Sequence, residues 1–142
     1  MPKFSKSSTR QLISAHADLQ TLFLEVIQYF DCKVIEGHRS IERQQELFHK
    51  GFSKVDGVKI KGKHNYTPSL ALDVVPYPID WNNTKRMYFF GGFVKGIAEK
   101  LHKENKIKHR LRWGGDWDSD TEVTDQTFID LPHFELIINQ KN

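Results

Sequence analysis

The chain has 142 residues, a length that usually forms one domain around one hydrophobic core. Apolar residues make up 38% of it and are spread in periodic blocks, which excludes wholesale disorder. A net charge of +3 is compatible with a polyanionic partner such as nucleic acid, teichoic acid or lipopolysaccharide, but so mild an excess more often reflects a solvated surface.

The single cysteine, Cys32, excludes an intrachain disulfide and a cysteine-based zinc cluster, so any metal must be bound by His, Asp or Glu. Cys32 precedes the apolar residues Val34 and Ile35, and we expect a buried core thiol there. The N-terminus lacks the apolar segment of a secretory signal, and no window approaches 18 apolar residues. We therefore expect a chain that is made in the cytoplasm and needs another agent to reach a substrate outside the membrane.

The first elements expected along the chain are two helices and a strand. Ser8 and Gln11 have the spacing of a capping box, which predicts that a short helix begins at Ser8. A strand is expected over residues 32–36. Between them, apolar residues recur at i, i+3, i+4, i+7, i+8 and i+11, the spacing of an amphipathic helix packed on a core; they are Leu19, Leu22, Phe23, Val26, Ile27 and Phe30.

A third helix is expected over residues 40–50, because Ser40 can cap its start and Gly51 can end it. Gln44 lies on the apolar stripe of this helix, and a polar side chain there needs a hydrogen-bond partner. The stripe is expected to face the core and consists of Ile41, Leu47 and Phe48.

The second half of the chain begins with a loop rich in glycine and lysine over residues 51–68, followed by a buried strand over residues 70–75. A long helix is expected from Thr84, with short strands at residues 111–113 and 133–138. Helices and strands mixed without regular βαβ alternation predict an α+β fold. The stripe of the long helix is Phe90, Phe93, Val94, Ile97, Ala98 and Leu101. Its glycines, each of which costs about 1 kcal/mol relative to Ala and so predicts close backbone packing, are Gly91, Gly92 and Gly96.

Asp73 is the first residue that indicates chemistry, because it interrupts an otherwise apolar strand. A buried carboxylate must be protonated, paired with a base or bound to a cation. A structural Asp that accepts from backbone amides or an arginine is an equally open interpretation. His64 lies nine positions earlier, and the turn over residues 65–68 can fold it back beside Asp73, although a histidine in a polar loop is usually a surface residue.

His133 opens the last expected strand, with Asp130 three residues before it and Glu135 two after it. In an extended strand His133 and Glu135 share one face, while Asp130 approaches from the preceding loop. Two simpler interpretations stay open: Asp130 as the cap of a turn, and Glu135 as a solvent-facing charge.

Together, His64, Asp73 and His133 form a donor set of two nitrogens and one oxygen that suits zinc and leaves a fourth position open. Zinc polarises a carbonyl and lowers the pKa of water, and a nearby carboxylate can then accept the proton of that water. The motifs His-Glu-x-x-His and Gly-x-Ser-x-Gly are absent, and Cys32 has no neighbouring base. Hydrolysis with zinc is therefore the chemistry that the residues favour.

Four motifs resemble the zinc L-alanyl-D-glutamate endopeptidases of phage endolysins, which are relatives of the D-alanyl-D-alanine carboxypeptidases and of the hedgehog signalling domain. The resemblance covers nearly the whole chain. In chain order the motifs are Gly37-His38-Arg39-Ser40 with Gln44, His64 through Ala71-Leu72-Asp73, Trp113-Gly114-Gly115-Asp116-Trp117, and Asp130-Leu131-Pro132-His133.

The resemblance implies a small antiparallel sheet flanked by helices, with a zinc site on the sheet and one catalytic domain over residues 1–142. It also implies that Zn²⁺ and the base Asp130 activate water to cut the L-Ala-D-Glu bond of the peptidoglycan stem peptide. Arg39 would stabilise the oxyanion, as a fixed guanidinium can in a water-poor cleft. Residues implied to bind substrate or support the site are Gln44, Trp113 and Asp116, and those implied to bind zinc are His64, Asp73 and His133.

By the same resemblance we expect a monomer that is made in the host cytoplasm and acts on peptidoglycan in the periplasm after a holin opens the membrane. One alternative is a D-Ala-D-Ala carboxypeptidase of the same fold. Another is a non-catalytic, zinc-containing domain that binds the cell wall, against which Asp130 and Arg39 speak. Nucleic-acid binding is a distant third that rests only on the basic charge.

Overall fold

The computed structural model describes residues 2–53, 55–58 and 61–138. Its elements in chain order are α1 (Lys6–Ile13), α2 (Ala17–Val26), β1 (Cys32–Glu36), α3 (Ile41–His49), the 3₁₀ turn η1 (Lys63–Asn65), β2 (Ala71–Pro76), α4 (Thr84–Lys103), β3 (Leu111–Gly114) and β4 (Asp130–Leu136).

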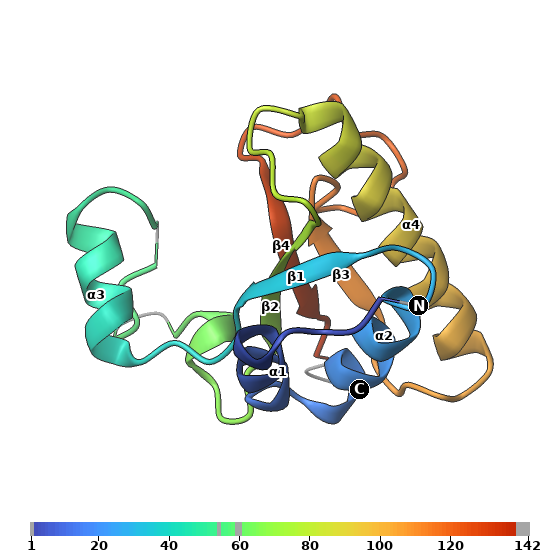
Figure 1. Ribbon diagram of the computed structural model, residues 1–142. Helices are drawn as coiled ribbons and strands as arrows, with labels where there is room; N and C mark the ends of the chain where they lie inside the picture. The colour runs from blue at the N-terminus through green and yellow to red at the C-terminus, as the bar shows by residue number, and fades with distance from the viewer. Residues whose placement is uncertain (1, 54, 59–60, 139–142) are drawn as a thin grey trace.

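The strands form one antiparallel sheet in the order β1-β2-β4-β3, and α2 and α4 lie on one side of it (Figure 1). The predicted α+β class with a small antiparallel sheet is therefore confirmed. Within the described residues, no helix has the length and apolar character needed to span a bilayer.

The core lies between α2, α4 and the face of the sheet that they cover. Alternate strand residues point into it, as the two-residue period of a strand requires. Burying each such Leu, Val or Phe side chain contributes roughly 1.5–3 kcal/mol. The sheet supplies Leu72, Val74, Phe134 and Leu136, α2 supplies Leu19, Leu22, Phe23 and Val26, and α4 supplies Phe90, Val94, Ala98 and Leu101. The opposite face carries the polar side chains Asp73, His133 and Glu135.

Cys32 is buried at the start of β1, as predicted. Burial, helped by the charge of Asp31, raises the pKa of the Cys32 thiol to about 12. A thiol with that pKa is protonated at neutral pH and is not a nucleophile.

Helix α1 begins earlier than predicted, because Ser5 and not Ser8 caps it. The side chain of Ser8 is buried and accepts a hydrogen bond from the backbone N–H of Val34 at 3.0 Å. Gln11 accepts in the same way from Gly37 at 3.0 Å. The spacing that resembles a capping box therefore serves to cover the open edge of β1.

Helix α3 has the predicted ends, with Ser40 accepting from the Arg43 N–H at 3.0 Å and Gly51 in a left-handed conformation (φ +82°). The prediction that its apolar stripe faces the core is wrong. Ile41 and Phe48 are 42% and 39% exposed, and Gln44 alone is buried among the nine residues of this fully described helix. Figure 1 shows α3 standing apart from the sheet. Helical periodicity predicts which side of a helix is apolar, but not which part of the protein that side packs against.

Close packing at the glycines of α4 is confirmed at one position and wrong at two. A Cβ atom on Gly91 would lie 2.0 Å from the Trp113 indole, so only glycine fits there. Gly92 and Gly96 have no atom within 4 Å of that position because both face solvent.

Candidate active site

The polar face of the sheet carries a row of side chains from three strands. Asp73 pairs with His133 on β4 and with Glu36 on β1. The second pairing depends on a β-bulge, because Val34 is opposite Val74 and Ile35 is the extra residue between the two pairs. The bulge thus brings Glu36 into line with Asp73 and His133.

His64 reaches this row from η1, across the loop that precedes β2. Its Nδ1 lies 2.7 Å from the Gly37 carbonyl oxygen, and its Nε2 lies 3.1 Å from Asp73 Oδ1. The Arg39 N–H donates to the His64 carbonyl at 2.7 Å and fixes the backbone of the turn. The structure therefore brings His64 beside Asp73, as the sequence predicts, although eight residues separate them.

His133 faces the same carboxylate oxygen from the other side. Its Nδ1 lies 3.3 Å from Asp73 Oδ1, and its Nε2 donates to Glu135 Oε1 at 2.8 Å. Each histidine thus turns one ring nitrogen to Asp73 and hydrogen-bonds through the other. We refer to His64, Asp73 and His133 as the three-residue cluster; its ligand atoms lie within 4.8 Å of one another.

The three-residue cluster fits a zinc ion. With Zn–ligand distances near 2.0–2.1 Å, tetrahedral ligands lie about 3.3 Å apart, close to the observed N···O separations of 3.1 and 3.3 Å. The outer nitrogen of each ring has an acceptor, so the inner nitrogen is the one that can give up its proton and offer a lone pair to a metal. Both features are expected of histidines that bind a metal.

Without a metal, the charges of the cluster hold it together as an ion pair. Burial alone would raise the pKa of Asp73, but hydrogen bonds from His133 and His64 outweigh it and hold that pKa far below its ordinary value. Burial alone would lower the pKa of His133, yet hydrogen bonds to Asp73 and Glu135 raise it to about 9. At neutral pH the His133 ring therefore carries a proton that a metal must displace.

Asp130 is the first residue of β4 and lines the same cavity as the three-residue cluster, a space of about 490 Å³ that we call the site cavity. Burial and the nearby charge of Asp73 raise the pKa of Asp130, against the opposing charges of His133, His64 and Arg39. A carboxylate with a raised pKa is a stronger proton acceptor than a free one.

Arg39 enters the site cavity with most of its guanidinium engaged. Its Nε and Nη2 donate to Glu36 at 3.1 and 2.5 Å, and its Nη1 donates to Gln44 Oε1 at 2.9 Å. Its Nη2 also lies 3.8 Å from Asp73 Oδ2. Because a guanidinium has five N–H groups, two remain for other partners.

Gln44, predicted to bind substrate or support the site, holds Arg39 in place. Both of its amide hydrogens are engaged, with Ser53 Oγ at 2.7 Å and the Val55 carbonyl at 2.6 Å. The Gln44 amide therefore has no free donor for a substrate. It links α3 and the loop after it to Arg39.

Trp113 and Asp116 lie outside the site cavity, so the structure gives no support to a direct substrate contact by either. Trp113 is 3% exposed, packs against Gly91 and donates from Nε1 to the Leu131 carbonyl at 2.8 Å. Asp116 accepts from the backbone N–H groups of Asp120 and Thr121 and so organises the loop after β3.

Two carboxylates of the site are not among the predicted site residues. Glu135, for which a solvent-facing position was an alternative, is 5% exposed and bonded to His133. Its place two residues after His133 on one strand was the available signal. Glu36, which holds Arg39, had no comparable signal because its position depends on the bulge at Ile35.

The walls of the site cavity come from α3 with the segment after it and from the loop that joins β3 to β4. The first wall includes Arg43, Leu47 and Phe52, and the second includes Trp117 and Phe128. The site cavity therefore lies over the sheet, between the α3 segment and the β3–β4 loop.

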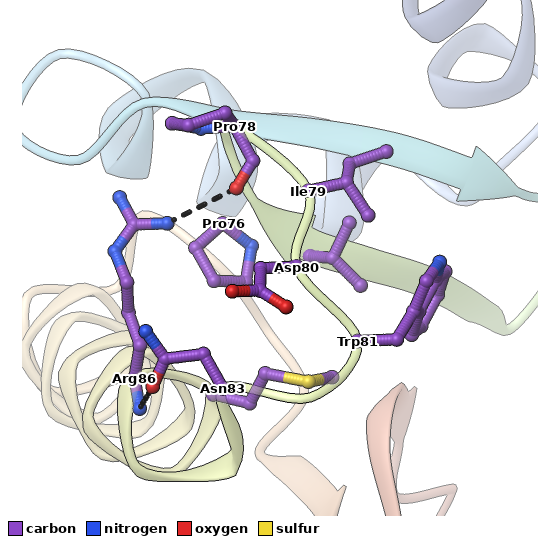
Figure 2. A pocket seen from close by; sticks show the side chains of 9 residues that line it. Pro76, Pro78, Ile79, Asp80, Trp81, Asn83 and Arg86 are labelled. Atoms are coloured by element: carbon purple, nitrogen blue, oxygen red, sulfur yellow. Dashed lines mark hydrogen bonds between the residues drawn. The ribbon is translucent and has the colours of Figure 1, made fainter.

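A second cavity, of about 320 Å³, lies beyond the end of β2 and contains none of the predicted site residues. Figure 2 shows its lining, with Arg86 donating to the Pro78 carbonyl at 3.4 Å. Arg86 also donates to Tyr77 O, and Asn83 accepts from the Arg86 N–H. These polar groups stabilise the loop before α4.

Comparisons with known proteins agree with this fold. A family model described as phage L-alanyl-D-glutamate peptidase matches residues 1–137. Among solved structures, the chain is similar to the crystal structure of the Serratia marcescens L-Ala D-Glu endopeptidase ChiX, with 23% sequence identity and a TM-score of 0.68. That similarity covers 95% of this chain and 90% of the other. The search of curated proteins found no match.

Proposed function

Because this chain belongs to the phage L-alanyl-D-glutamate peptidase family, we propose that it is a zinc-dependent endopeptidase that cleaves the L-Ala-D-Glu bond of the peptidoglycan stem peptide. The observation that carries the proposal is the convergence of His64 Nε2, His133 Nδ1 and Asp73 Oδ1 in one cavity with Asp130. These three atoms would hold the ion. When bound, Zn²⁺ would act as a Lewis acid on the scissile carbonyl and lower the pKa of an attacking water from about 15.7 towards 7.

Asp130 is the general base in this proposal. It shares the site cavity with the three-residue cluster, and its raised pKa suits a group that accepts a proton from water. The same carboxyl then returns the proton to the leaving amine of D-Glu. A carboxylate in this position distinguishes a hydrolase from a domain that only binds zinc.

Arg39 stabilises the negative charge that develops on the carbonyl oxygen. Its guanidinium is fixed by Glu36 and Gln44, and its Nη2 lies 3.8 Å from Asp73 Oδ2, beside the proposed metal position. A preorganised donor of this kind stabilises the transition state without reorganising during the reaction. Glu36 and Gln44 act through Arg39 as positioning residues.

The family to which the chain belongs suggests a biological setting for the activity. We propose that the chain is one catalytic domain, acts as a monomer in phage lysis, and reaches peptidoglycan from the host cytoplasm after a holin opens the membrane. The match of the family model to residues 1–137 supports the single domain.

Product analysis tests the reaction. Purified peptidoglycan treated with the zinc-loaded protein should yield peptides that begin with D-Glu and glycan that retains L-Ala, as identified by mass spectrometry. Asp130→Asn should lower kcat by about 10²–10⁴-fold, since general base catalysis contributes that much. The matched change Asp80→Asn, at an exposed aspartate of the second cavity, should leave kcat unchanged.

Release of free D-Ala with uncut stem peptides would instead identify a carboxypeptidase. Equal rates for the parent and for Asp130→Asn would remove Asp130 as the base.

A further inference from the structure

Glu135 is a buried carboxylate whose two oxygens serve different partners. Oε1 accepts from His133 Nε2 at 2.8 Å, and Oε2 accepts from Arg112 Nε and Nη2 at 3.1 and 2.7 Å. Lys63 Nζ lies 3.8 Å from Oε2. A carboxylate that is 5% exposed is costly without such partners, so all of them contribute to holding it.

The sheet itself fixes this arrangement. Glu135 lies two residues after His133 on β4, so both side chains share the polar face. Arg112 is directly opposite Glu135 on β3. Two donors of Arg112 hold Oε2, which helps to keep Oε1 turned towards the His133 ring.

We propose that Glu135 is a positioning residue for the metal ligand His133. By accepting a hydrogen bond from His133 Nε2, it turns Nδ1 towards Asp73 and His64, where the metal would bind. A carboxylate acceptor also makes the imidazole a better donor to a metal. The inference rests on the proposed function, in which His133 is a zinc ligand.

The two histidines differ in how they are supported. His64 donates to a backbone carbonyl, that of Gly37, whereas His133 donates to a side chain. A substitution can therefore remove the hydrogen-bond acceptor of His133, but not that of His64, while both histidines stay in place.

The test measures zinc dissociation constants of the metal-free full chain by competition with a chromophoric chelator, for the parent, Glu135→Gln and Glu135→Ala. Loss of such a partner lowers metal affinity by about 10–100-fold, so we expect the affinity order parent, then Glu135→Gln, then Glu135→Ala. Glu99→Gln is the matched control, because Glu99 is held by Arg110 through the same two donor atoms, at 3.2 and 2.9 Å, on the surface of α4. Its zinc affinity should equal that of the parent.

The melting temperature of each metal-free variant separates positioning from a structural role. A merely structural Glu135 would lower that temperature while the folded variants bound zinc as tightly as the parent, and this result would overturn the inference. If Glu135→Ala does not fold, Glu135→Gln, which keeps the shape of the side chain, decides in the same way. A parent chain that binds no zinc would contradict the proposed function and the inference together; zinc binding that is equal in all variants contradicts only the inference.

Discussion

The two histidines that face Asp73 each have their second ring nitrogen bonded to an acceptor, Gly37 O for His64 and Glu135 for His133. This pattern keeps a proton on each outer nitrogen and leaves the inner nitrogens 3.1 and 3.3 Å from one carboxylate oxygen. Ion pairing with Asp73 alone would not require His64 Nε2 and His133 Nδ1 to face the same oxygen, Oδ1. In the proposed zinc site, the orientation of both ligand rings therefore depends on hydrogen bonds to groups outside the cluster.

Proton release is the first consequence that can be measured. In the metal-free protein the pKa of His133 is raised to about 9, so the ring is protonated at pH 7. Zinc binding through Nδ1 must displace that proton, and zinc affinity should fall about tenfold for each pH unit below 9 from this group alone. Isothermal titration at pH 7 in buffers of different ionisation enthalpy should show about one proton released from His133 per zinc. Heats that do not depend on the buffer would contradict the assigned state of His133.

At the scale of elements, the strands and most helices were predictable because each apolar block has one period. Strand β1 lies at the predicted residues, whereas β4 begins at Asp130, three residues before the predicted start. The failure at α3 has a different cause, because this helix packs outside the core: Ile41 and Phe48 are exposed, and Leu47 lines the site cavity. Periodicity predicts the faces of one helix but not where that helix lies in the fold. The position of α3 depends on a contact with another segment, the hydrogen bond from Arg39 to Gln44.

Helix α4 contains two adjacent glycines, Gly91 and Gly92, whose substitution by Ala should change the stability of the fold in opposite directions. Gly91→Ala should destabilise the fold by about 1–3 kcal/mol, because its Cβ would overlap the Trp113 indole. Gly92→Ala should stabilise it by about 0.5–1 kcal/mol, because the new methyl group meets nothing and Ala favours the helix. Urea unfolding of both variants checks this. Equal changes in the free energy of unfolding would show that Trp113 does not pack on Gly91.

Asp18, in the first turn of α2, ties this helix to the segment before β3. It accepts from His109 Nδ1 at 2.8 Å and from the backbone N–H groups of Lys108 and His109 at 2.9 and 3.0 Å. Burial alone would raise the pKa of Asp18, but these hydrogen bonds lower it below its ordinary value. The stability that the carboxylate contributes is therefore present above the unfolded pKa of about 3.9 and is lost as the pH falls through the lower folded pKa.

Asp18→Asn should therefore reduce the free energy of unfolding at pH 7 by about 1–3 kcal/mol. The difference from the parent should shrink as the pH is lowered from 5 towards 2, as measured by urea unfolding across that range. A difference that stays constant over this range would contradict the account of Asp18.

At the scale of the whole molecule, one face of the sheet is committed to the core and the other to the site. Asp73 and His133 could be singled out from the sequence, because Asp73 interrupts an apolar strand and His133 follows a proline at the start of another, whereas His64 rested mainly on the family resemblance. Their meeting point was not, since it depends on the register between β2 and β4. The contribution of Glu36 likewise depends on a bulge in the pairing of β1 with β2, and the contact of Glu135 with Arg112 depends on the pairing of β3 with β4. Spacing along one chain reveals neither.

The most direct test of the whole account is a titration of zinc into the metal-free protein, with hydrolysis of purified peptidoglycan measured at each step. We predict that activity is absent without zinc, rises in proportion to added zinc and saturates at one ion per chain. Full activity of the metal-free protein, or saturation only beyond one ion per chain, would contradict the claim that His64, Asp73 and His133 form a single catalytic zinc site.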